Sequence, residues 1–310
     1  MLRKTALTLT LTALPGFALA APEGWQPLLA PSDLSALLER GEDIHIIRVT
    51  GDFEAGHIPG AVSSPYSEWR AGPTNPGALK PELEYESEAV RVGVTADRPT
   101  VIVHNGDSPS DMGAAARVYW TLKSLGVQDL ALLNGGYQAW AKAGLPTAKG
   151  EVTPTESDFY AEWRDDWYIP TSEVVELVDS GEARLVDSRP EGLFEGITWS
   201  IARPGTIRSA ENLQFSQFFE DGLMVAPERA RAIAAEQGLQ DAPVTVSFCN
   251  TGHWAAINWF ALSELAEIPN TRLYAESMAE YTIHGHALDN EPNRVAYLWR
   301  STKRWVDGLF

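Results

Sequence analysis

The single cysteine of this chain, Cys249, is the residue best suited to nucleophilic chemistry. It stands in the segment Cys249-Asn250-Thr251-Gly252-His253-Trp254-Ala255, between an apolar run and a helical pattern. A strand, a tight glycine-containing loop and a helix start can turn several backbone N–H groups toward one point, where they stabilise an anion. The thiolate, which is the reactive form of cysteine, is such an anion. We therefore predict an activated thiolate beside amides that also hold an anionic substrate.

The two residues after the glycine have open roles. His253 could supply a positive charge or a proton, although an imidazole is mostly neutral near pH 7. Trp254 could form a wall of the site and exclude water, or it could pack in the core. Cys249 itself could be a small buried apolar residue, and the chain would then be a binding or scaffold protein with an inert thiol.

Composition limits the partners of this site. The chain has 310 residues, of which 44% are hydrophobic and 21% charged, as in a soluble globular protein. The net charge of −18 argues against nucleic acid or an anionic membrane as a partner, since both attract positive surfaces. An anionic substrate would also be repelled at long range, so its site needs local donors or cations.

The first 20 residues are typical of a secretory signal. Arg3 and Lys4 precede an apolar run, and Ala18-Leu19-Ala20 offers a small-residue cleavage site. No later run approaches the roughly 20 apolar residues of a transmembrane helix. We expect a periplasmic or secreted protein, cleaved near Ala20.

An internal repeat indicates two copies of one domain. A helix and strand pattern at 31–49 recurs at 170–187, the proline-bounded strand 99–104 matches 243–248, and a helix and a strand follow in each copy (114–125 and 130–133, then 255–265 and 271–274). Strands that alternate with helices indicate an α/β fold, with a parallel sheet flanked by helices in each domain. Ligands bind such sheets at the carboxyl ends of the strands, where Cys249 falls. The same alignment places Asn105 opposite Cys249.

These patterns divide the chain into five parts: a signal peptide at 1–20, an N-terminal domain at 21–150, a linker at 151–166, a C-terminal domain with Cys249 at 167–290, and a tail at 291–310. The tail combines basic and aromatic residues, so it could pack on the body or dock a partner.

Four motifs in this order resemble the tandem-domain rhodanese family, the thiosulfate and 3-mercaptopyruvate sulfurtransferases. The resemblance covers Pro31 to Ala287 and is carried by Gly56-His57-Ile58-Pro59-Gly60-Ala61, by Leu132-Leu133-Asn134-Gly135-Gly136-Tyr137 with Trp140, by Leu185-Val186-Asp187-Ser188-Arg189, and by Cys249-x-x-Gly252. It implies two rhodanese-like domains, of which only the second carries the nucleophile. It also implies that Cys249 takes a sulfane sulfur from a small anionic donor as a persulfide and passes it to cyanide or a thiol, without a cofactor.

The resemblance implies a site with Cys249 as the catalytic residue, Asp187 as a support, and a set of substrate contacts: Asn250, Thr251, Gly252, His253, Trp254 and Arg189. The loop carries no basic residue after the cysteine and does not read Cys-Gly-Ser-Gly-Val-Thr, and residues 190–196 lack the arginine common in the family. Arg189, Arg203 and Arg208 remain as candidate cations for the substrate.

Other functions would place different demands on these residues. A persulfide carrier or binding module serving another exported protein would use the same thiol and dock through the tail. A cysteine phosphatase would need Cys-x5-Arg, but Ala255 holds the arginine position. His284, His286 and Asp289 give only a weak metal signal, so no metal is predicted.

Overall fold

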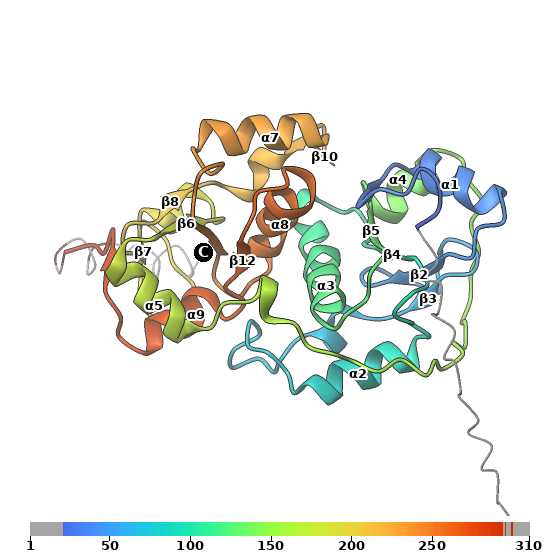
Figure 1. The fold of residues 1–310 in the computed structure, drawn as a ribbon, viewed down its shortest axis with the longest axis horizontal. Helices are drawn as coiled ribbons and strands as arrows, with labels where there is room; N and C mark the ends of the chain where they lie inside the picture. Colours follow the sequence, from blue (N-terminus) through green and yellow to red (C-terminus); the bar gives the residue numbers. More distant parts are fainter. Residues whose placement is uncertain (1–20, 294, 296–298, 300–310) are drawn as a thin grey trace, which may run out of the picture.

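The computed structural model describes residues 21–293, 295 and 299, so the predicted signal segment and most of the predicted tail lie outside the described residues. Two parallel sheets organise the chain, one in each half (Figure 1). The first has the strand order β1-β5-β4-β2-β3 and the second β12-β11-β6-β8. The predicted α/β fold is confirmed. We call the parts of the chain around these sheets the first and the second domain.

The helices and strands follow one another along the chain as β1 (Leu28–Leu29), α1 (Pro31–Glu39), β2 (His45–Arg48), β3 (Val62–Ser63), η1 (Tyr66–Trp69), α2 (Glu82–Arg91), β4 (Thr100–Val103), η2 (Pro109–Asp111), α3 (Met112–Ser124), β5 (Leu130–Leu133), α4 (Gly136–Lys142), η3 (Asp165–Trp167), α5 (Thr171–Ser180), β6 (Ala183–Asp187), α6 (Glu191–Phe194), β7 (Thr206–Ile207), β8 (Glu211–Asn212), η4 (Phe215–Phe218), β9 (Phe219–Glu220), β10 (Leu223–Met224), α7 (Pro227–Glu236), β11 (Val244–Phe248), α8 (Trp254–Phe260), η5 (Ala261–Leu265), β12 (Thr271–Leu273), α9 (Ser277–Ile283) and β13 (Leu288–Asp289). The predicted helix at 255–265 is thus α8 continued by a π-type segment, η5. Among the described residues, no helix is both long and apolar enough to cross a bilayer.

Each sheet is covered by helices on both faces, which explains why β2, β4 and β5 are buried along their whole length and why β6 and β11 are buried over their last three and four residues. In the first domain, α1 and α4 pack on one face through residues such as Leu34 and Trp140, while α2 and α3 cover the other. In the second domain, α5 and α9 cover one face through residues such as Val174 and Met278, while α7 and α8 cover the other.

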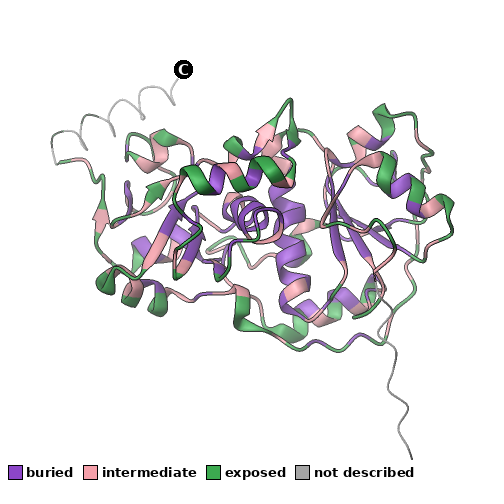
Figure 2. Ribbon diagram, turned by 45° about the horizontal axis from the view of Figure 1, so that its top comes forward, coloured by how far each residue is buried: buried purple, intermediate pink, exposed green. Residues whose placement is uncertain are grey.

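The two domains share one hydrophobic core. Helices α3 and α8 lie side by side at the middle of the molecule (Figure 1), and Figure 2 shows the buried residues gathered in the strands and in these central helices. Tyr119 of α3 packs edge-on against Phe260 of α8, with ring centroids 5.1 Å apart, and its hydroxyl donates to Glu264 at 2.7 Å. Lys123 reaches the same carboxylate at 2.7 Å. The domains are therefore joined by buried packing and a shared polar contact.

The hydrogen bonds at the sheet edges correct the predicted alignment by one residue. Val49 donates to the carbonyl of Val103, as Ser188 does to that of Phe248. One residue further on, Tyr137 donates to the carbonyl of His104 and Met278 to that of Cys249. The position of Cys249 in the first domain is thus held by His104, and the prediction of Asn105 is wrong.

The predicted linker runs along the first domain. Residues 151–164 form no helix or strand, yet several of their backbone groups are bound. The amide of Ala161 donates to Glu86 Oε2 at 2.8 Å, and the amide of Arg164 donates to the carbonyl of Ser124 at 2.7 Å. This segment is hydrogen-bonded to the middle of α2 and to the end of α3.

The interface can be tested at Tyr119, which is 3% exposed. Tyr119→Ala should lower the free energy of unfolding by about 3–5 kcal/mol, because it leaves a cavity between α3 and α8. Tyr119→Phe removes only the hydrogen bond to Glu264 and should cost about 1 kcal/mol. Urea unfolding monitored by tryptophan fluorescence measures both values, and equal losses in the two variants would refute the packing role of the ring.

Candidate functional site

Cys249 is fixed at the carboxyl end of β11 by residues of α9. Its amide donates to Ser277 Oγ at 3.1 Å, and that hydroxyl donates to the carbonyl of Tyr274 at 2.7 Å. Ser277 adopts φ +54°, a left-handed conformation that is uncommon for a residue other than glycine and is often found near functional sites. Cys249 is 1% exposed, so its thiol is covered in this conformation.

The loop after Cys249 leaves a run of amides without partners. The N–H groups of Asn250, Thr251, Gly252 and His253 donate no hydrogen bond to any other described residue. Gly252 has φ +70°, and a Cβ there would overlap the guanidinium of Arg117 and the carbonyl of Ala275. The position therefore requires glycine, and the loop offers N–H donors to an anion.

His253 and Trp254 face the first domain. The His253 ring lies between the Tyr66 hydroxyl, 3.2 Å from Nδ1, and the carbonyl of Ser110, 2.8 Å from Nε2. Burial and the nearby Arg70 charge lower the pKa of His253 to about 4, so the imidazole is neutral at physiological pH. Trp254 donates to Ser110 Oγ at 2.7 Å and stacks on Phe215, with centroids 5.2 Å apart.

Asp187 and Arg189 form a buried ion pair below the loop. They are 0% and 1% exposed, and their closest nitrogen–oxygen distance is 2.5 Å. Arg189 also donates to the carbonyl of Gly205 at 2.8 Å and to Asn250 Oδ1 at 3.1 Å. These acceptors surround the Arg189 guanidinium. The geometry therefore indicates that Arg189 positions the Asn250 side chain and does not contact the substrate.

The other two candidate cations lie in surface ion pairs. Arg203 pairs with Glu291 at 3.0 Å, and Arg208 pairs with Asp179 at 2.6 Å. Among the described residues, neither arginine forms a hydrogen bond or an ion pair with the Cys249 loop.

Two arginines of the first domain reach the loop instead. Arg70 donates to the carbonyl of Thr251 at 2.7 Å and to the Tyr66 hydroxyl at 3.0 Å. Arg117 is fully buried against Gly252 and donates to the carbonyl of Gly77 at 3.0 Å. Its Nε and Nη1 have no partner among the described residues. Positive charge therefore comes to the Cys249 loop from the other domain.

Sequence reasoning missed Arg70, Arg117 and Ser277. Arg70 and Thr251 are 181 residues apart, so no local pattern connects them. The only available signal was the position of Arg70, which follows shortly after the motif at 56–61.

The structure gives no support to a metal at the histidine pair. The rings of His284 and His286 are 6.1 Å apart, while Asp289 accepts a hydrogen bond from the amide of Ser209 at 2.8 Å. Within the described part of the chain, no group of three or more His, Cys, Asp or Glu residues is arranged to hold a metal ion.

Comparisons with known proteins agree with this fold. The family model of the rhodanese-like domain matches residues 30–143, within the first domain. The human protein named 3-mercaptopyruvate sulfurtransferase is 30% identical over 241 residues, covering 76% of this chain and 78% of the relative. A protein of Synechococcus elongatus named putative thiosulfate sulfurtransferase is 27% identical over 306 residues, covering 92% of each chain.

A solved structure shares the arrangement of both domains. The crystal structure of SseA, a 3-mercaptopyruvate sulfotransferase from Escherichia coli, superimposes with a TM-score of 0.71 at 22% identity, covering 81% of this chain and 98% of that one. At this identity the likeness concerns the fold. Together with the identity to the human relative over most of its length, it shows that this chain belongs to the rhodanese-like family of sulfurtransferases.

Proposed function

We propose that the protein is an exported enzyme that moves a sulfane sulfur from a small anionic donor to a thiophilic acceptor through a persulfide on Cys249. One observation carries the proposal: the only thiol of the chain directly follows β11 and begins a loop whose amides have no partner among the described residues and whose Thr251 carbonyl binds the Arg70 guanidinium. Relatives named thiosulfate and 3-mercaptopyruvate sulfurtransferases support donors of this class.

The reaction with thiosulfate balances in two displacements. The Cys249 thiolate attacks the outer sulfur of thiosulfate, an S–S bond forms to Sγ, and sulfite leaves with the electron pair of the broken S–S bond. Cyanide then attacks the terminal sulfur of the persulfide, thiocyanate leaves, and the thiolate is regenerated. Both steps pass through anions, which the amides of residues 250–253 and the Arg70 charge can stabilise.

The local cations offset an unfavourable overall field. The net charge of −18 repels an anionic donor at a distance. Arg70 and Arg117 supply positive charge at the loop, where the described part of the second domain contributes the paired Arg189. Because Cys249 is 1% exposed, a donor reaches Sγ only when the side chains that cover it move aside.

Export belongs to the same proposal and depends on residues 1–20, whose composition is typical of a secretory signal. A second candidate function uses the same thiol. The covered position of Cys249 also suits a persulfide carrier, which accepts a sulfur and releases it only to another exported protein.

Intact-protein mass spectrometry tests the covalent step. Incubation with thiosulfate, or separately with 3-mercaptopyruvate, should add the mass of one sulfur atom to Cys249, and cyanide should remove it. Cys249→Ser should show no adduct and no transfer, while circular dichroism reports an intact fold. Transfer retained in Cys249→Ser would refute the assignment, because the chain has no second thiol. An adduct that persists with cyanide would favour the carrier.

The positive charge of Arg70 should strengthen the binding of an anionic donor. Arg70→Gln should raise KM for thiosulfate by about tenfold, because it removes a positive charge from the loop that receives the anion. Arg70→Lys should retain part of this effect. Arg208→Gln, which alters a surface pair, is the matched control. An unchanged KM in Arg70→Gln would show that this cation does not serve the site.

His253 should not act as an acid or base. Its pKa of about 4 leaves it neutral from pH 6 upward, and both ring nitrogens are bound. His253→Gln should therefore reduce kcat by far less than the roughly 10²-fold typical of a lost general acid or base, and the pH profile between 6 and 9 should keep its shape. A 10²-fold loss with a vanished limb of the profile would restore a catalytic role for this histidine.

A further inference from the structure

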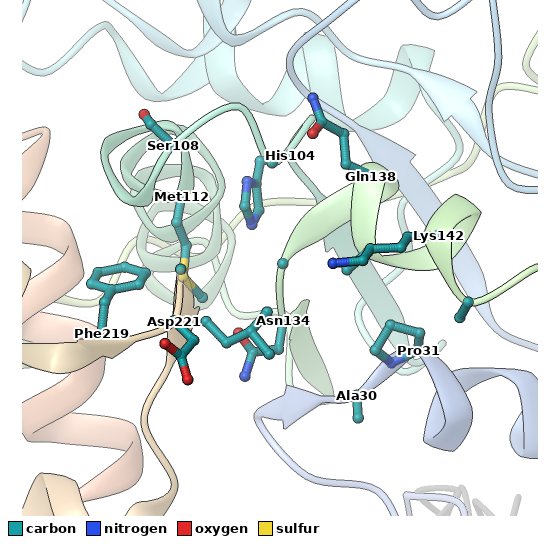
Figure 3. A pocket seen from close by; sticks show the side chains of 16 residues that line it. Ala30, Pro31, His104, Ser108, Met112, Asn134, Gln138, Lys142, Phe219 and Asp221 are labelled. Atoms are coloured by element: carbon teal, nitrogen blue, oxygen red, sulfur yellow. The ribbon is translucent and has the colours of Figure 1, made fainter.

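A cavity of about 600 Å³ lies in the first domain, away from Cys249. It opens at the carboxyl ends of β4 and β5, where His104 and Asn134 follow the strands, and the hairpin β9–β10 of the second domain lines it with Phe219 and Asp221 (Figure 3). Parallel α/β sheets bind ligands at this edge. Cys249 occupies the equivalent edge of the second sheet.

His104 holds the position that Cys249 holds in the second domain, and it lines this cavity. Its side chain is 3% exposed, and Nδ1 lies 3.3 Å from Asp111 Oδ2, which also accepts the amide of Gly106 at 2.8 Å. Burial alone would raise the pKa of Asp111, but the hydrogen bonds from His104 and Gly106 lower it to about 2, so the carboxylate is ionised. The ionised Asp111 carboxylate accepts a hydrogen bond from Nδ1, and Nε2 is the ring nitrogen that is left without a partner.

The Nε2 atom is the unsatisfied group of the cavity. It is buried and has no hydrogen-bond partner among the described residues. Buried polar groups are nearly always bonded, so an occupant with an O–H or N–H group is expected opposite this nitrogen.

The charged and apolar lining restricts the occupant further. The Lys142 ammonium points toward the cavity (Figure 3) and forms no ion pair or hydrogen bond with another residue in the described part of the chain. Met112, Phe219 and Leu223 present apolar surface. Asp221 on the hairpin disfavours a second negative charge, and the amide of Gly106 is already bound to Asp111, which leaves fewer donors for a phosphate.

We propose that this cavity is a second ligand site, and that it binds a small organic monocarboxylate that carries an apolar body and a hydroxyl group. Lys142 pairs with the carboxylate, the hydroxyl group, which can donate or accept, forms a hydrogen bond with His104 Nε2, and the apolar residues cover the body. The proposed role is binding alone, with no bond made or broken. The site does not depend on the chemistry of Cys249.

Three probes separate the parts of this recognition: 4-hydroxyphenylacetate, phenylacetate without the hydroxyl, and 4-hydroxyphenylacetamide without the charge. Binding is measured by isothermal titration calorimetry and saturation-transfer NMR on the Cys249→Ser protein, so that thiol chemistry contributes nothing. We expect saturable binding of 4-hydroxyphenylacetate, with each of the other probes weaker by about tenfold.

Variants of the two polar residues provide the matching test. Lys142→Gln should weaken 4-hydroxyphenylacetate by about tenfold and leave the amide probe unchanged, while Lys149→Gln, at an exposed lysine outside the cavity, should change neither. His104→Phe should remove the preference for the hydroxylated probe, and His104→Gln serves if the phenylalanine variant does not fold.

Selective binding that follows both variants supports the site. No saturable binding of 4-hydroxyphenylacetate up to about 10 mM, or equal affinity for all probes in every variant, would overturn it and leave a cavity that holds only water. Because sulfur transfer is measured separately by mass spectrometry, failure of this site leaves the role proposed for Cys249 unaffected.

Discussion

The loop that carries Cys249 is held by contacts from the other domain. Arg70 binds the carbonyl of Thr251, Arg117 lies against Gly252, and the carbonyl of Ser110 binds His253. These contacts exist only because α3 and α8 bury their facing sides against each other and fix the distance between the domains. A loss of packing at Tyr119 would therefore reach the loop as well as the core. The second domain provides the thiol and the loop amides, but Arg189, its arginine below the loop, forms an ion pair with Asp187.

The two domains share one backbone plan and differ in the side chains that it displays. Gly136 and Ser277 occupy equivalent places, and both have positive φ values, +63° and +54°. Serine at this place accepts the strain and gains a hydroxyl that binds the amide of Cys249. Glycine avoids the strain and lets the chain approach His104 closely, because a Cβ there would overlap the carbonyl of that residue. The same turn thus supports a cysteine thiol in one domain and a buried histidine ring in the other.

The strands and the repeat could be predicted because apolar runs bounded by proline and glycine mark buried parallel strands. The alignment failed by one residue because it matched the prolines rather than the faces of the strands. Val101 and Val103 pack toward α1 and α4, as Val246 and Phe248 pack toward α5 and α9. Side chains along a strand alternate between the two faces of the sheet. An alignment that matches these faces therefore pairs His104 with Cys249 as equivalent positions.

Arg70 and Arg117 could not be predicted as cations of the site, because they come from the other domain. The search for a positive group stayed within the second domain and found Arg189, Arg203 and Arg208, whose charges are all paired with carboxylates. A chain with a net charge of −18 has an acidic partner near almost any exposed arginine. Arg117 escapes this because it is fully buried at the domain interface, and Arg70 because it is half-buried there and bound to a hydroxyl and a carbonyl. In such a protein, an interface between domains is where a cation can remain free for an anion, and the Cys249 loop lies at that interface.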